Sequence, residues 1–283
     1  MQEVGPWSRH QGTYKCAPAS ALSAYTFNGT VAVFHEHERQ IKYWLDQRPI
    51  ADYSEQVSDD DRVVILRPRD PKRFCLTGTQ IASVGCDVGS QVTVFYQDVE
   101  GYLCYRNIGG LVWDEPVALC KALEGTGIAA VRWNTGNNPE IRVYYQDESY
   151  NIYERACSRG IWSANPTLIG DDMDRRTTIS AVHWVCDEMS GDEIRVYYQE
   201  GPSTIQEKGW TSGKGWCWAS ILFDVFVAEF NVHVFTRGVL QYPVLNLWIA
   251  SKEGQVLLRR AYNFKEAWVP AIGHSLPLTG TPY

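Results

Sequence analysis

The chain has 283 residues and a mass of 32.1 kDa. Its 26 basic and 33 acidic side chains give a formal net charge of −7. This balance argues against a nucleic-acid or anionic-membrane partner, because binding to phosphates needs clustered cations. Hydrophobic residues make up 45%, and no apolar stretch of about 20 residues is present that could span a membrane. The composition predicts a soluble globular protein with a sizeable core.

The cysteines and one glycosylation motif indicate the cellular compartment in which the protein is expected to function. There are eight cysteines, none of them in a C-x-x-C pair. Their even number and the sequon Asn28-Gly29-Thr30 favour a secreted, disulfide-bonded glycoprotein. The alternative is that they are buried free thiols, which behave as small hydrophobes. The first residues lack a signal peptide, so the chain is either cytosolic or has lost its leader.

A repeat of about 50 residues organises the chain. Ile-Arg-Val-Tyr-Tyr-Gln occurs at 141–146 and again at 194–199, preceded each time by a similar apolar segment, at 128–133 and 179–184. Weaker copies of this pair of segments lie at 22–25 with 31–34, at 81–84 with 92–97, and at 227–230 with 245–249. The segments alternate β-branched and aromatic residues between turn residues, so each unit is predicted to consist of strands only.

The repeats predict an all-β fold, a single β-propeller domain over 1–283 with four-stranded blades. Five units are detected, and a degenerate sixth leaves five or six blades open. Their approximate limits are 19–77, 78–124, 125–176, 177–222 and 223–276. Residues 1–18 and 277–283 are expected to close the ring. Residues 52–73 are surplus to the repeat and are expected to form an insertion at the top or the edge of a blade.

Two units carry the same three chemistry-bearing residues. These are Arg142, Glu154 and Trp162 in the third unit and Arg195, Glu207 and Trp216 in the fourth. A guanidinium and a carboxylate can grip neighbouring hydroxyls, while an indole covers the apolar face of a ring, which suits a sugar. The alternative is an ordinary cross-strand ion pair beside a packed tryptophan.

These strands, the Gly-Ile-Trp segment at 160–162, the Gly-Lys-Gly-Trp segment at 213–216 and the ending Thr-Gly-Thr-Pro at 279–282 together resemble the fungal fucose-specific lectins of the Aleuria type. The resemblance implies a six-bladed propeller with fucose pockets between blades, each held by an Arg, a Glu and an aromatic residue. It transfers those roles to the two triads alone. In the second unit the matching positions hold Thr93, Tyr105 and Trp113, so the charged pair is lost there. The first and fifth units have also lost it.

Two functions follow from this pattern. The loss of charged pairs favours a lectin scaffold refitted for apolar small molecules. The resemblance extends to lectin-like fungal hetero-Diels–Alder cyclases, which join tropolone-type quinone methides to sesquiterpenes. Such a pericyclic enzyme needs positioning and hydrogen-bond donors rather than a nucleophile. The alternative is a secreted lectin that binds fucosylated glycans through its two intact triads.

No cofactor or metal is expected, and catalytic residues are left unassigned. His35 and His37 share one face of a predicted strand, but no third ligand is in view. His183 and His233 are expected in the core or at its rim. The expected partner is a small molecule, either a quinone methide plus a terpene or a fucosylated glycan, with no nucleic acid and no membrane. A homodimer is left open.

Overall fold

The computed structural model describes residues 21–27, 30–46, 63–66, 68–86, 91–109, 112–135, 138–186, 191–201, 204–224, 235–236, 245–250, 257–263 and 267–270, from 218 onward through the backbone alone. These residues form strands and one short 3-10 helix, η2 (Pro71–Arg73). The expectation of an all-β fold is confirmed. No helix in this part of the chain is long and apolar enough to cross a membrane.

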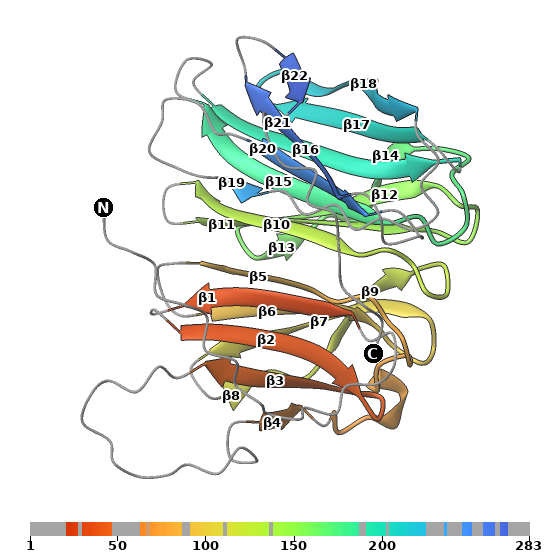
Figure 1. The fold of residues 1–283 in the computed structure, drawn as a ribbon. Coiled ribbons are helices and arrows are strands. Elements are labelled where there is room, and N and C mark those ends of the chain that lie inside the picture. Colours follow the sequence, from red (N-terminus) through yellow and green to blue (C-terminus); the bar gives the residue numbers. More distant parts are fainter. Residues whose placement is uncertain are drawn as a thin grey trace, which may run out of the picture.

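The strands form five antiparallel sheets, which follow one another along the chain and are named I to V here (Figure 1). Sheet I contains β1 (Leu22–Phe27), β2 (Thr30–His37), β3 (Gln40–Asp46) and β4 (Val63–Leu66). Sheet II contains β5 (Ala82–Cys86), β6 (Gln91–Gln97), β7 (Tyr102–Gly109), β8 (Val112–Trp113) and β9 (Val117–Lys121). Sheet III contains β10 (Ala129–Thr135), β11 (Asn138–Gln146), β12 (Ile152–Ser158), β13 (Ile161–Trp162) and β14 (Thr167–Gly170).

Sheet IV contains β15 (Ile179–Cys186), β16 (Gly191–Glu200), β17 (Thr204–Thr211) and β18 (Gly215–Asp224). Sheet V contains β19 (Phe235–Thr236), β20 (Leu245–Ala250), β21 (Leu257–Asn263) and β22 (Ala267–Pro270). Sheets I, IV and V are four-stranded, as the repeat predicted, and sheets II and III have five strands. The expected ring closure by 1–18 and 277–283 lies outside the described residues, as does 52–62 of the expected insertion at 52–73. The expectation is wrong for 63–66, which form β4 and pair with β3 as part of sheet I.

The outermost strand is split in sheets II and III. β8 and β9 both pair with β7, and β13 and β14 both pair with β12. The breaks contain Pro116 and Pro166. Proline has no N–H to donate to the ladder, so pairing stops before it and resumes after it. Sheet IV has no proline in this stretch, and β18 continues with register shifts instead.

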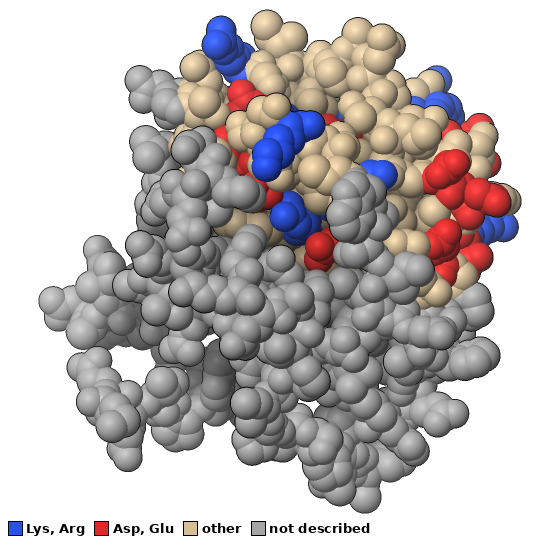
Figure 2. Space-filling model, turned by 90° about the horizontal axis from the view of Figure 1, so that it is seen from above, with Lys and Arg blue, Asp and Glu red and all other residues tan. Residues whose placement is uncertain are grey.

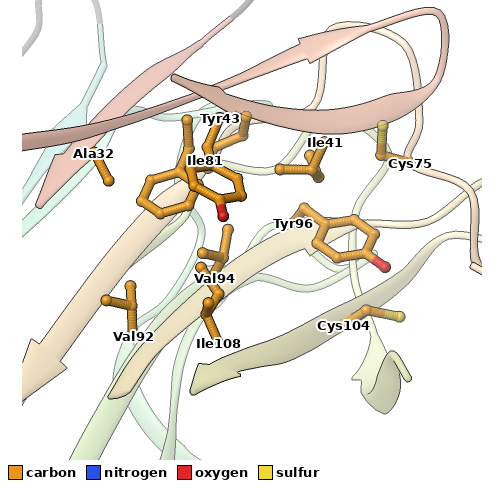
Figure 3. Packing of buried hydrophobic residues seen from close by; sticks show 11 residues of the cluster. Ala32, Ile41, Tyr43, Cys75, Ile81, Val92, Val94, Tyr96, Cys104 and Ile108 are labelled. Carbon is orange, nitrogen blue, oxygen red and sulfur yellow. The ribbon is translucent and has the colours of Figure 1, made fainter. Parts of the chain in front are cut away.

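Successive sheets pack through their first strands. β1 contacts β5, β5 contacts β10 and β10 contacts β15, and Figure 1 shows β1, β5 and β10 side by side. Buried clusters fill the spaces between sheets I and II, II and III, and III and IV. Figure 3 shows the first of these, in which Tyr43 of β3 and Tyr96 of β6 are almost fully buried.

This two-sided packing explains the repeated hexapeptide. Along β11 alternate side chains point to opposite faces of the sheet. Ile141, Val143 and Tyr145 pack toward sheet II, whereas Tyr144 packs toward sheet IV. Both faces are therefore covered, and a strand with both faces covered reads as a nearly continuous apolar run.

Buried glutamines join sheet II to sheet III and sheet III to sheet IV. Gln97 ends β6, and its Nε2 donates to the carbonyls of Ala122 and Leu123, at 3.1 and 3.0 Å, while its Oε1 accepts from Gly125 N at 2.8 Å. Those residues belong to the segment that leads from sheet II into sheet III. Gly125 has φ of +75°, a left-handed conformation that favours glycine.

Gln146, at the end of β11, repeats this arrangement. Its Nε2 donates to Asp174 O at 2.7 Å, and its Oε1 accepts from the backbone nitrogen atoms of Arg176 and Thr177 at 2.8 and 3.3 Å. Both glutamines are fully buried with their amides satisfied. A buried amide stabilises the fold only when its hydrogen bonds are made, since burying a polar group without a partner costs free energy.

Gln146→Leu is expected to lower the free energy of unfolding by about 3 kcal/mol, because it leaves the backbone groups around Arg176 unsatisfied in the core. Urea denaturation of the variant and the wild-type protein measures this difference. Gln80→Leu is the matched control, because Gln80 is exposed, and it is expected to change stability little. Equal effects of the two substitutions would contradict the role assigned to Gln146.

Candidate functional site

A cation, a carboxylate and an indole meet between sheets III and IV. Arg142 on β11 and Glu154 on β12 share one face of sheet III, since Glu154 pairs with Tyr144 and Arg142 pairs with Ala156. That face packs against sheet IV, where Trp216 lies on β18. The Trp216 ring stands edge-on to Tyr144, with centroids 6.2 Å apart and planes at 89°.

The guanidinium of Arg142 is held in place by sheet III. Nη1 donates to the carbonyls of Ile141 and Cys157 at 2.9 and 3.1 Å, and both Nη1 and Nη2 lie 3.1 Å from Oε2 of Glu140. Its Cζ stands 4.9 Å from the ring centre of Trp133, a cation–π contact. Among the described residues no acceptor pairs with Nε–H, so the fixed head keeps donor capacity for a ligand.

The carboxylate of Glu154 is nearly buried and hydrogen-bonded. Tyr144 Oη donates to Oε2 at 2.9 Å. Burial raises the pKa of Glu154 above its ordinary value, while the Tyr144 hydrogen bond, Arg142 and the Trp216 indole oppose the rise in pKa. Burial also raises the pKa of Tyr144, so its hydroxyl stays a donor. We call Arg142, Glu154 and Trp216 the III/IV cluster.

The prediction that Arg142 and Glu154 share a site with Trp162, the tryptophan of their own repeat, is wrong. Trp162 pairs with Cys157, which in turn pairs with Ile141, so Trp162 lies on the face of sheet III opposite Arg142. Its ring packs against Tyr105 and Phe95 of sheet II, at centroid distances of 5.4 and 6.1 Å. Trp162 and Trp216 therefore each lie at the interface with the preceding sheet, and Trp216 is the tryptophan beside Arg142 and Glu154.

The II/III interface has the same backbone frame with different chemistry. Thr93 and Tyr105 stand where Arg142 and Glu154 stand in sheet III, and Thr93 Oγ1 donates to Asn107 Oδ1 at 2.8 Å. The rings of Phe95, Tyr105 and Trp162 pack together there. Trp113 lies in β8, and its side chain is outside the description.

The face of sheet IV opposite sheet III carries the second charged pair. Arg195 Nε lies 3.7 Å from Glu207 Oε1, and Nη1 lies 2.9 Å from Oε2 of Glu193. Its Cζ is 5.1 Å from the ring centre of Trp184. Trp268 lies on β22 of sheet V, and its side chain is outside the described residues.

Several of these residues escaped the sequence analysis. Glu140 and Glu193 hold the arginines, and the signal was available, because a glutamate precedes the Ile-Arg pair in both strong repeats. Trp133 was missed as well. His183 of sheet IV stacks on it, with centroids 4.4 Å apart, and bonds to Asp192 at 2.9 Å. Burial lowers the pKa of His183, although Asp192 opposes that shift in its pKa.

The two histidines of β2 are placed differently. His37 Nδ1 lies 2.8 Å from Lys42 Nζ, and His35 is buried. In the described part of the chain no group of three or more His, Cys, Asp or Glu could hold a metal ion. His233 lies outside the described residues. On the described part of the surface in Figure 2, basic and acidic side chains are interspersed.

The disulfide expectation is wrong for five of the eight cysteines. Those described with side chains are free thiols: Cys75, Cys104, Cys120, Cys157 and Cys217. Three of them are buried, as expected of cysteines that act as small core residues. The expectation of secretion then depends on the sequon, whose Asn28 is outside the described residues.

Known proteins share both sequence and fold with this chain. The family described as fungal fucose-specific lectin matches residues 74–230, more than half of the chain. The fucose-specific lectin of Aleuria aurantia is 29% identical over 140 residues, covering 49% of this chain and 43% of that lectin. The fucose-specific lectin of Aspergillus fumigatus is 32% identical over 130 residues, covering 44% and 41%. The chain thus matches less than half the length of these curated relatives.

Two solved structures have a similar fold. AofleA from Arthrobotrys oligospora, in a mutant form, superposes with a TM-score of 0.69 at 20% identity, over 90% of this chain and 72% of that chain. The six-bladed β-propeller lectin of Aleuria aurantia gives a TM-score of 0.64 at 17% identity, over 93% and 80%. At these identities the likeness supports the propeller fold.

Glu154→Gln is expected to stabilise the protein at neutral pH. The folded-state pKa lies above the ordinary value of 4.5, so ionisation of Glu154 lowers stability at a pH above both values. That loss disappears as the pH falls below the ordinary pKa. The stability gain of the variant over the wild-type protein should therefore shrink between about pH 8 and pH 4 in urea titrations. A gain that grows on acidification would contradict a raised pKa.

Proposed function

The chain belongs to the fungal fucose-specific lectin family, and on that premise we propose that it binds fucose-bearing glycans through the III/IV cluster. The observation that carries the proposal is the convergence of Arg142, Glu154 and Trp216 from two neighbouring sheets. It is the one triad of this kind whose three side chains are all described.

The chemistry of the cluster suits a 6-deoxy sugar. Fucose presents hydroxyl groups as well as an apolar face with a methyl group. The guanidinium of Arg142 donates, the carboxylate of Glu154 accepts, and the indole of Trp216 offers an apolar surface. Since sheet III holds Arg142 and Glu154 in place before any ligand arrives, little ordering is needed on binding.

A second site of the same kind is proposed around Arg195 and Glu207. Sugar sites of this size are individually weak, and two sites on one rigid scaffold gain avidity toward a surface that displays many glycans. The sheet II positions, Thr93 and Tyr105, are assigned no sugar.

The two sites predict a defined stoichiometry. In calorimetric titrations with L-fucose, Arg142→Ala is expected to leave one site, and Arg142→Ala combined with Arg195→Ala to abolish binding. Trp216→Ala is expected to weaken the affinity of the first site for L-fucose roughly tenfold to a hundredfold, because the indole no longer shields the charged hydrogen bonds from water. Arg175→Ala removes an exposed cation as the control. Binding that survives in the double variant would refute the assignment.

The Diels–Alder cyclase is the second candidate, favoured by the aromatic II/III interface. Phe95, Tyr105 and Trp162 make this interface aromatic where the charged pair is lost. Tyr105 and Trp162 are only half-buried, and aromatic side chains of this kind suit a flat apolar substrate. A thermal-shift and product assay with tropolone-derived quinone methides and sesquiterpene alcohols tests it. Product formation that Tyr105→Ala abolishes while L-fucose binding stays intact would support a cyclase. Absence of product and of any ligand-induced stabilisation would exclude it.

A further inference from the structure

A glutamate accompanies each sugar-site arginine. Glu140 lies two residues before Arg142 on β11, and Glu193 lies two residues before Arg195 on β16. Side chains two apart on a strand share a face, which brings each carboxylate to its guanidinium. The ion pairs measure 3.1 and 2.9 Å.

Each carboxylate is also held by a hydroxyl from the next strand. Ser158 Oγ donates to Glu140 Oε2 at 2.6 Å, and Thr211 Oγ1 donates to Glu193 Oε2 at 2.9 Å. Oε2 of Glu140 therefore accepts from Ser158 and from both terminal nitrogens of Arg142. The same three-part unit is thus built twice.

The glutamate occurs only in the repeats that have the arginine. Where Arg142 is replaced by Thr93, Ala32 or Asn246, the position two residues earlier holds Gln91, Thr30 or Val244. A carboxylate needed for the fold alone would have a place in all five sheets. Its restriction to two of them ties it to the guanidinium.

The charge balance of the III/IV cluster then depends on Glu140. Arg142 is 14% exposed and Glu140 13% exposed, so water screens this pair only weakly. Glu154 adds a second carboxylate. Half-buried Lys208 also lies on the side of sheet IV that faces sheet III, because it pairs with Val196. Asp192, which bonds to His183 beside Trp133, is a further carboxylate on this side of sheet IV. Loss of Glu140 would make the net charge around Arg142 one unit more positive.

On the basis of the proposed function, we infer that Glu140 determines ligand charge: it cancels the charge of Arg142 and leaves the Nε–H donor, so the site accepts neutral sugars and rejects anionic ones. An arginine without a carboxylate partner would attract uronates and sulfated sugars. The paired arginine recognises hydroxyl groups by hydrogen bonds without that attraction. Glu193 has the same role toward Arg195.

Three sugars that differ only at C6 test this inference. L-fucose carries a methyl group there, L-galactose a hydroxymethyl group and L-galacturonate a carboxylate. The Arg195→Ala background isolates the III/IV cluster. There, L-galacturonate is expected to bind at least about tenfold more weakly than L-galactose, and Glu140→Gln is expected to reduce that ratio about tenfold. Glu140→Asp keeps the charge and should keep the ratio. Glu148→Gln, at an exposed turn, is the matched control.

The outcomes are distinguishable. No binding of L-fucose by the protein with both sites intact overturns the proposed function and this inference together. Binding of L-fucose with equal affinities for L-galactose and L-galacturonate overturns this inference alone. An unchanged ratio in folded Glu140→Gln also overturns it. If Glu140→Gln does not fold, the ratios of the Arg195→Ala background and of Glu140→Asp decide, because both retain the carboxylate and must discriminate.

Discussion

The hydrogen bonds that join one sheet to the next support everything else in this molecule. Gln97 and Gln146 sit at the ends of second strands and bind the segments that enter the following sheets. Their amides are buried, so any change in the position of the next sheet would leave polar groups unsatisfied. The sheets are therefore held at a defined separation, and the III/IV cluster, which draws residues from two sheets, has a defined geometry.

The cluster itself is assembled from groups that are costly to bury. Arg142 and Glu140 satisfy one another, and backbone carbonyls and Ser158 take up further bonds. Glu154 is left with a raised pKa, because Tyr144 and Trp216 only partly compensate for its burial. A carboxylate in such a state gains more from a sugar hydroxyl than one that is fully solvated.

The interfaces between sheets share the same backbone arrangement and differ in the side chains that pack there. Between sheets II and III, Phe95, Tyr105 and Trp162 pack against one another in place of a charged pair. Between sheets I and II, Ala32, Phe34 and Tyr43 are buried in the core. Packing stabilises these interfaces, whereas the III/IV interface keeps polar groups whose stability depends on mutual pairing. Propeller repeats can thus vary in function without loss of the fold.

The sequence alone determined the all-β class, the repeat and the identity of the charged pairs, because strand periodicity and turn residues are local properties of the chain. It also carried the Glu-Ile-Arg signal behind Glu140 and Glu193. Only the tertiary structure decided that Trp216, not Trp162, joins Arg142 and Glu154, and that five cysteines are free thiols. Adjacent strand residues point to opposite faces, and which face meets which neighbouring sheet is settled by the packing of whole sheets rather than by spacing along the chain.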